Sequence, residues 1–456
     1  MAPQVDRDPF IRGSSGQLRI RPAVLVTTSS YGTRFDVDAI RSKFPALRAH
    51  VDVPVYFDGP AGTQVPDHVI SRMLQALTDY RANVNGRFPT SAKATMVIDE
   101  ARSAVADLFN AALPGQIIFG PNMTSLTFGM SRALAGRFGP SDELVITGMQ
   151  HDGNVSPWLH MAEERGMPVH RVDFDPATYE LDLEQLDRVL SPATALVAIN
   201  YASNVLGTIT DAGEICRRAA AFGAITYVDA VQYAPHAPID VRSLGCDLLV
   251  ASPYKFYGPH LGVLYGRREL LEELQPPRLR VAPSNVPDRF ETGVKSLEGI
   301  SGTLGAIEYL EWVGGTFGTP TPDPDGTLRP RTRTLHSAFA AMTQYETPLT
   351  AALIQGLQSL KGVKVHGITD VSDFERRVPT VSISVSGIDN AALASYLGEQ
   401  GIYVWEGHVY APDVIERLGL EGSGGIVRFG LTHYNTMQEV DRAVAAVESH
   451  LNKSSI

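Results

Sequence analysis

The sequence has only two cysteines in 456 residues, and this scarcity excludes several kinds of protein. Cys216 and Cys246 are too few for a disulfide framework or a cysteine-based metal cluster, so we expect both to be small buried side chains and expect no metal site. Long apolar runs are also missing near the N-terminus, where the longest, Ala23–Val26, is too short for a signal peptide or a membrane span. These absences predict a cytoplasmic protein without membrane contact.

Basic residues are too few and too scattered to suggest a nucleic-acid site. The chain has 39 Lys and Arg against 50 Asp and Glu, a formal charge of −11, and no stretch concentrates the basic residues. A Gly-x-Gly-x-x-Gly turn after an early strand is missing too, which disfavours a Rossmann dehydrogenase. We therefore expect no nucleic-acid partner.

The sequence does contain a regular alternation of short apolar runs and helical patterns, from about residue 95 to 265. This alternation is typical of βαβ units and predicts an α/β fold around a mostly parallel sheet. The strands expected from it are 117–119, 144–147, 196–199, 225–228, 248–250 and 263–265. The helices expected between most of them are roughly 124–137, 154–166, 183–190 and 212–222.

A segment rich in glycine and proline, from Gly314 to Pro330, should not continue a helix. We therefore expect a large domain over 35–312, whose first part packs on the small domain, a linker over 313–330 and a smaller α+β domain over 331–456. Residues 1–34 lack periodicity and are expected to be a flexible arm. In the small domain, the patterns predict helices at 331–360, 390–400 and after Thr436, and strands at 381–385 and 427–429.

Four polar features follow predicted strands, at the edge where open α/β sheets bind ligands. The loop Gly120–Ser125 leaves a strand and opens a helix, so its backbone N–H groups and the hydroxyls of Thr124 and Ser125 are suited to a phosphate, although a plain helix cap would have the same sequence. His151 follows the strand at 144–147, where its ring could stack on an aromatic cofactor, although a lone histidine is more often structural.

The other two features are charged side chains at the ends of apolar strands. Asp229 follows the strand at 225–228, and a buried carboxylate there needs a cation such as a protonated pyridine nitrogen, unless it caps the next helix. Lys255 follows the strand at 248–250, a setting that no other lysine shares, and Ser252 lies near enough in sequence to contact a phosphate. Together the four features predict a site for pyridoxal 5′-phosphate (PLP), held as a Schiff base on Lys255.

At these residues the sequence resembles the class V aminotransferase group of fold-type I PLP enzymes, and within it the cysteine desulfurase and selenocysteine lyase family. The resemblance runs from Tyr56 to about Glu448. It is carried by segments in the family's order: Tyr56–Asp58, His151–Asn154, Ser203–Thr208, Val228–Gln232, Lys255–Pro259, Arg289–Gly293 and Arg428–Gly430. It implies a large domain around a mostly parallel sheet, a smaller α+β C-terminal domain, and a homodimer with shared active sites that acts on an amino acid.

The resemblance also implies roles for individual residues. It makes Lys255, His151 and Asp229 the catalytic residues, which respectively hold the cofactor, stack on its ring and meet its ring nitrogen. Further cofactor contacts are implied for Met123, Thr124, Asn204, Gln232, Ser252 and, through a backbone N–H that reaches the neighbouring subunit, Val294. Substrate contacts are implied for Asn204, His408, Tyr410 and Arg428, of which Arg428 would bind the α-carboxylate unless it forms a surface salt bridge.

One departure from the family pattern bears directly on the reaction. Desulfurases carry a catalytic cysteine within Arg-Thr-Gly-His-His-Cys on a loop of the small domain, whereas the corresponding stretch here is Trp405–Pro412, which keeps Gly407 and His408 but has Tyr410 where the thiol should be. The predicted small domain has no cysteine at all. Tyr254, Val294 and Asn83–Gly86 also replace family residues, so we interpret the substrate pocket as rebuilt.

The favoured hypothesis is therefore a lyase. Lys255 would remove the Cα proton of an amino acid whose Cβ carries sulfur or a similar leaving group, and elimination would follow without an enzyme thiol. The alternative is an enzyme that forms a carbon–carbon bond at Cα, as in the loline pathway, or that epimerises or transaminates its substrate. A non-enzymatic scaffold is disfavoured, because it would have no need of a lysine beside a carboxylate and a phosphate site.

Overall fold

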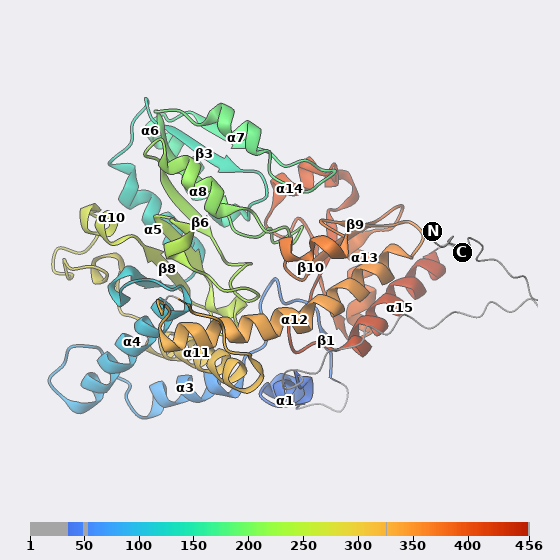
Figure 1. Ribbon diagram of the computed structural model, residues 1–456, viewed down its shortest axis with the longest axis horizontal. Coiled ribbons are helices and arrows are strands. Elements are labelled where there is room, and N and C mark those ends of the chain that lie inside the picture. The colour runs from blue at the N-terminus through green and yellow to red at the C-terminus, as the bar shows by residue number, and fades with distance from the viewer. Residues whose placement is uncertain (1–34, 49–52, 325, 455–456) are drawn as a thin grey trace, which may run out of the picture. The chain divides into compact units, whose positions relative to one another are not determined.

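The computed structural model describes residues 35–48, 53–324 and 326–454, so the predicted arm at 1–34 lies outside the described residues. A seven-stranded sheet with the order β2-β8-β7-β6-β5-β3-β4 forms the first layer of the fold (Figure 1). Neighbouring strands from β4 to β7 run parallel, whereas β8 is antiparallel to both β7 and β2. The strands are β2 (Ile117–Gly120), β3 (Glu143–Thr147), β4 (Val169–Val172), β5 (Thr194–Asn200), β6 (Ile225–Asp229), β7 (Leu248–Ala251) and β8 (Gly262–Gly266).

Helices cover both faces of this sheet, so successive side chains of one strand enter different apolar clusters. Ile118 and Leu264 pack with α5 and α6, while Phe119 and Val263 pack on the opposite face with α4, α8 and α11. Burial on both faces explains why the inner strands are continuously apolar. The helices around the sheet are α3 (Asp67–Thr78), α4 (Pro89–Leu108), α5 (Met123–Ala135), α6 (Ser156–Arg165), α7 (Leu183–Val189), α8 (Ala212–Ala220), α9 (Val241–Leu244), α10 (Arg268–Glu273) and α11 (Leu297–Phe317). The α/β fold with a mostly parallel sheet is thereby confirmed.

A second, four-stranded sheet lies in the C-terminal part of the chain and has the order β12-β13-β10-β9, with all neighbours antiparallel. Its strands are β9 (Val363–His366), β10 (Thr380–Val385), β12 (Trp405–Gly407) and β13 (Ile426–Gly430). The helices near it are α12 (Pro330–Gln358), α13 (Asn390–Glu399), α14 (Pro412–Arg417) and α15 (Met437–Ser454).

The long helix α12 joins the two sheets through their cores. Leu335 and Phe339 in its first half belong to the apolar cluster of the seven-stranded sheet, whereas Leu353 and Leu357 in its second half pack with the four-stranded sheet. Figure 1 shows α12 running from α11 to the strands of the C-terminal sheet. The N-terminal part of the chain is attached there too, because β1 (Val55–Tyr56) pairs in parallel with β11 (Ile402–Tyr403). The short helices α1 (Val37–Arg41) and α2 (Pro45–Arg48) precede it.

The segment from Gly314 to Pro330 differs from the expectation, because α11 continues through Gly314 and ends at Phe317. At Gly314 the backbones of α11 and α12 touch, and a Cβ atom would collide with the carbonyl group of Thr334. The glycine therefore serves close helix packing instead of ending the helix. The division into domains at 313–330 stays a prediction.

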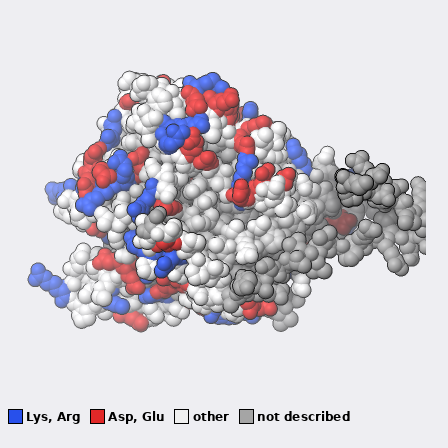
Figure 2. Space-filling model, viewed as in Figure 1, with Lys and Arg blue, Asp and Glu red and all other residues white. Residues whose placement is uncertain are grey.

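Both cysteines lie in the core, with Cys216 1% and Cys246 3% exposed. None of the helices over the described residues is both long and apolar enough to cross a membrane. On the face shown in Figure 2, basic and acidic side chains are interspersed, without segregation by sign.

Candidate active site

One cavity at the carboxyl ends of the central strands brings together eight of the residues that the sequence predicts for the cofactor. This convergence follows from the parallel strands, whose carboxyl ends meet at the same edge of the sheet. The eight residues are Met123, Thr124, His151, Asn204, Asp229, Gln232, Ser252 and Lys255.

Lys255 lies in a 3-10 turn (Pro253–Lys255) just past β7 and is 8% exposed. Its Nζ donates a hydrogen bond to the carbonyl oxygen of Pro60. Burial and the nearby Arg428 lower the pKa of Lys255 to about 7, although Asp229 and Asp58 oppose the shift. A lysine with such a pKa is largely an uncharged nucleophile slightly above neutral pH, as Schiff-base formation requires.

Asp229 is the last residue of β6 and is 5% exposed. Burial raises its pKa to about 6, while a hydrogen bond from the backbone N–H of Val231 (2.8 Å) and the charge of Lys255 act in the opposite direction. No helix begins directly after Asp229, since the next one starts at Val241. The helix-cap alternative for this carboxylate is therefore wrong, and a cationic ring nitrogen remains a suitable partner.

His151 opens a 3-10 turn (Asp152–Asn154), and its Nδ1 accepts a hydrogen bond from the N–H of Gly153 at 2.9 Å. This acceptor role places the proton of the neutral ring on Nε2. Burial, together with Lys255 and Arg428, lowers the pKa of His151 to about 4. The ring is thus a flat, uncharged surface at the cavity, suited to stacking.

The predicted phosphate end of the cavity is formed by the first turn of α5. Asn122 caps this helix by accepting a hydrogen bond from the N–H of Ser125 at 2.8 Å. Met123 and Thr124 follow in the same turn and line the cavity, as does Ser252. The partial positive charge of a helix N-terminus favours an anion at this place.

Four polar atoms of residues that line the cavity are buried without a hydrogen-bond partner in the described part of the chain. They are Nδ2 of Asn200, Oδ1 of Asn204, Oε1 of Gln232 and Oγ of Ser252. Buried polar atoms are nearly always paired in folded proteins, so these residues fit a polar ligand. The aromatic ring and phosphate of PLP match the stacking surface, the carboxylate, the helix N-terminus and the lysine.

Arg428 reaches the site from β13 of the C-terminal sheet. It is 4% exposed, and its Nη1 donates a hydrogen bond to the carbonyl oxygen of Asn204 at 2.9 Å. Its Nε is buried without a partner among the described residues. A surface salt bridge is therefore the wrong interpretation of Arg428. A buried guanidinium with a free N–H is suited to a carboxylate ligand.

The loop that carries His408 and Tyr410 lies against the His151 turn. The rings of Tyr410 and His151 are stacked, with centroids 5.4 Å apart and planes at 21°. The carbonyl oxygen of Tyr410 accepts from the N–H of Asp152 (2.7 Å), that of Val409 accepts from Asn204 Nδ2 (2.8 Å), and His408 Nδ1 accepts from the N–H of Tyr410 (3.1 Å). The loop that carries His408 and Tyr410 is thus hydrogen-bonded to the residues around the cavity.

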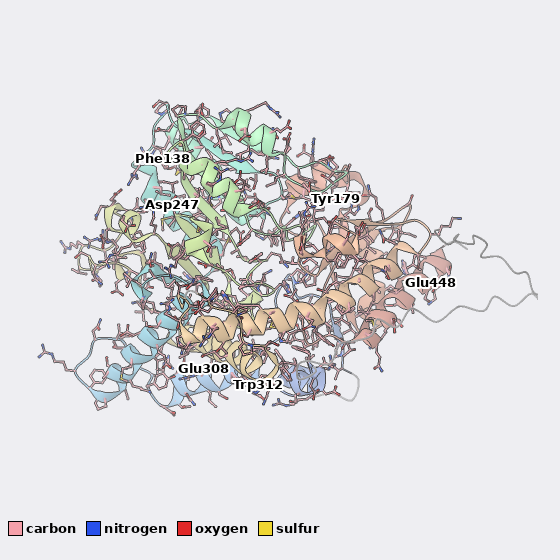
Figure 3. The ribbon with its side chains drawn as sticks, viewed as in Figure 1. Phe138, Tyr179, Asp247, Glu308, Trp312 and Glu448 are labelled. Atoms are coloured by element: carbon pink, nitrogen blue, oxygen red, sulfur yellow. The ribbon has the colours of Figure 1, made fainter. Side chains whose placement is uncertain are left out.

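An apolar cluster supports this loop from behind. Val409 packs there with Val414 of α14 and with Tyr179, which Figure 3 labels where the segment after β4 approaches α14. Val409 and Tyr410 have positive φ angles of 41° and 59°, a conformation that costs non-glycine residues energy and persists only where contacts impose it.

Two residues stand apart from the sequence expectation. Val294 is 80% exposed and does not line the cavity of its own chain, so its predicted contact with a neighbouring subunit stays a prediction. Asp58, which the sequence did not assign to the site, follows β1 and has a buried Oδ1 without a partner among the described residues. Its only sequence signal was its place in the Tyr56–Asp58 segment.

The aminotransferase class-V family matches residues 55–316 and 333–443. This chain belongs to the aminotransferase class-V family. Members use PLP, so it is a PLP-dependent enzyme. It is similar to the aminotransferase-like protein FGM3 of Gibberella zeae (32% identity, 91% of this chain and 98% of the relative) and to a cysteine desulfurase of Yersinia pestis (30%, 91% and 98%).

Two solved structures extend the similarity of this class-V enzyme to the fold. The apo structure of a cysteine desulfurase from Thermococcus onnurineus NA1 has a TM-score of 0.80 at 26% identity and covers 94% of this chain and 100% of its own. The cysteine desulfurase CsdA of Escherichia coli has a TM-score of 0.77 at 25% identity and covers 92% and 99%. The fold-type I architecture and the predicted family resemblance are thus confirmed.

Proposed function

We propose that this enzyme is a carbon–sulfur lyase that acts on an α-amino acid without an enzyme thiol. The observation that carries this proposal is the position of Tyr410, which stacks on His151 in the loop where desulfurases carry their cysteine. Cys216 and Cys246 do not line the cavity and are buried in the core, which raises the pKa of Cys216 to about 12 and that of Cys246 well above its ordinary value. Neither is a suitable nucleophile.

The residues around the cavity have different roles in such a reaction. PLP, when bound, withdraws electrons from the substrate Cα. Arg428 holds the α-carboxylate, with Asn204 beside it, and Asp229 and His151 hold the cofactor ring. Lys255 Nζ takes the proton from Cα, and the electrons left there expel the sulfur group from Cβ.

The leaving group needs a proton or a stabilising donor, because a thiolate departs with the electron pair of the broken C–S bond. Tyr410 supplies a hydroxyl at the loop that covers His151, and His408 lies two residues away with its ring at a T-shaped angle to that of Tyr410. Either side chain can donate to the sulfur. This role replaces the attack by a thiol in a desulfurase.

A transaminating enzyme is the second candidate, and the relative from Gibberella zeae supports it by its name, aminotransferase-like protein FGM3. The two reactions share the removal of the Cα proton and differ in the step after it. Elimination, followed by hydrolysis with one water molecule, yields a thiol, ammonia and a keto acid from one amino acid, whereas transamination passes the amino group to a second keto acid.

The product balance distinguishes these candidates. Purified enzyme is incubated with L-cysteine, S-alkyl and S-aryl cysteines and alanine, with and without added keto acids, and thiol, ammonia and keto acid are measured. We expect thiol and ammonia in equal amounts without an added keto acid, and neither from a Lys255→Ala variant. Amino-group transfer that requires an added keto acid, without thiol release, would replace the lyase proposal by the second candidate.

We also propose a homodimer with shared active sites. Val294 is exposed in a turn whose Glu291 is held by an ion pair with Arg102 at 2.8 Å, and the nearby Leu279 and Val281 are 71% and 84% exposed. Apolar side chains that are exposed together in one patch are typical of surfaces that a partner covers, and we propose that these residues contribute to such a patch. Analytical ultracentrifugation at micromolar concentration should give a dimer, and a fully active monomer would contradict it. A cytoplasmic location stays a prediction.

A further inference from the structure

Asp58 lies on a short segment that contacts both β13 and Lys255. It forms a parallel bridge with Gly430, two residues beyond Arg428. Pro60, two residues after Asp58, fills the space that a Cβ atom of Gly430 would need, and its carbonyl oxygen accepts the hydrogen bond from Lys255 Nζ. The segment therefore touches both the strand of the arginine and the ammonium group of the lysine.

The carboxylate of Asp58 can accept a further hydrogen bond or interact with a cation. Its Oδ1 is buried and has no hydrogen-bond partner within the described ranges. Burial raises the pKa of Asp58 to about 6, while its own backbone N–H and the charges of Arg428 and Lys255 act in the opposite direction. The carboxylate thus lies in the electrostatic field of both cations, without a direct ion pair to either among the described residues.

Other charged or titratable groups face Lys255 from neighbouring elements. Asp229 lies at the end of β6, His151 follows β3, and the ring of Tyr254 in the same turn lies 5.2 Å from Nζ. Asp229 is the carboxylate predicted for the cofactor nitrogen. Among the described residues, the other carboxylate that acts on Lys255 is Asp58, which also acts on Arg428.

We propose that Asp58 is a positioning residue whose carboxylate is the counter-charge of Lys255 and Arg428, so that it keeps a proton on the lysine nitrogen when the cofactor is bound. This inference rests on the proposed role of Lys255 as the cofactor-holding residue. A nearby negative charge stabilises the protonated, cationic form of that nitrogen. Removal of the Asp58 charge should therefore lower the pH at which the lysine nitrogen loses its proton.

The test is a pH titration of the visible absorbance of holoenzyme, which needs no substrate. Asp58→Asn keeps the shape of the side chain and removes its charge, whereas Asp58→Glu keeps the charge. Asp441→Asn is the matched control, because Asp441 is an exposed residue of α15 and its substitution changes the net charge equally. Circular dichroism and thermal unfolding establish that each variant is folded.

We expect the midpoint of the absorbance change to fall by about half a pH unit or more in Asp58→Asn, and to stay near the wild-type value in Asp58→Glu and Asp441→Asn. An unchanged midpoint in folded Asp58→Asn, or an equal fall in Asp441→Asn, would overturn the role of Asp58. If Asp58→Asn does not fold, a midpoint for Asp58→Glu that falls by as much would overturn it. Wild-type protein that shows no visible band with PLP would instead refute the proposed site at Lys255.

Discussion

Substitution of Arg428 by glutamine tests the proposed substrate site most directly. The guanidinium is buried, donates to the Asn204 carbonyl oxygen at 2.9 Å and keeps an unpaired Nε among the described residues. It can therefore offer two N–H groups to a carboxylate while keeping its bond to Asn204. A hydrogen bond to a charged group contributes about 1.5–3 kcal/mol, so the loss of two should cost about 3 kcal/mol or more.

This magnitude corresponds to a fall in kcat/KM of at least about 100-fold for Arg428→Gln. The assay is the initial rate on the best amino acid of the panel, over a range of substrate concentrations. The matched control is the amine that lacks the α-carboxylate, because it cannot use the arginine. Its affinity, followed by the change in visible absorbance, should be the same for wild type and variant.

The stability of the variant separates a binding role from a structural one. Burial lowers the pKa of Arg428 to about 10, although Asp58 and Tyr254 act in the opposite direction. Glutamine removes this buried charge and the hydrogen bond to Asn204 together, so circular dichroism and thermal unfolding should establish that the variant is folded before its kinetics are compared. A fall in kcat/KM below about five-fold, or an equal loss of affinity for the amine, would refute the assignment of Arg428 to the carboxylate.

Four further outcomes are expected. Lys255→Ala should abolish both the visible band with PLP and turnover, and retention of either would move the cofactor to another residue. The rate at which wild-type apoprotein binds PLP should increase as the pH rises through about 7, because the lowered pKa of Lys255 leaves its amine deprotonated above this pH. A rate that does not change across this range, measured by stopped-flow absorbance, would contradict the prediction. Asp229→Ala should keep some cofactor but lose most turnover, whereas unchanged turnover would exclude its role at the ring nitrogen. The Cys216→Ser/Cys246→Ser variant should keep most of the activity, whereas Tyr410→Phe should lose it. If the double variant is folded but inactive, and a persulfide can be trapped on the native enzyme, the desulfurase mechanism would be restored.

The sequence alone was sufficient for the elements whose signals are local. Continuous apolar runs predicted the inner strands, because a strand covered on both faces has no polar side. The edge strand β4 was not predicted from the sequence, because two of its four residues, His170 and Arg171, are polar. Lys255 and Asp229 could be singled out for the same local reason, as charges that end apolar strands.

The tertiary structure decided how these distant residues come together. The family resemblance had already assigned Asn204, Lys255 and Arg428 to one site, whereas Asp58 is brought to them only by its pairing with Gly430 and by the contact of its segment with Lys255. The structure also shows that Gly314 lies at a contact between two helices instead of at a helix end, and that Arg428 is buried instead of forming a surface salt bridge. The periodicity of apolar residues along a chain indicates which faces of each segment are buried. The charges around a side chain depend instead on which other segments pack against it, and the fold determines that packing.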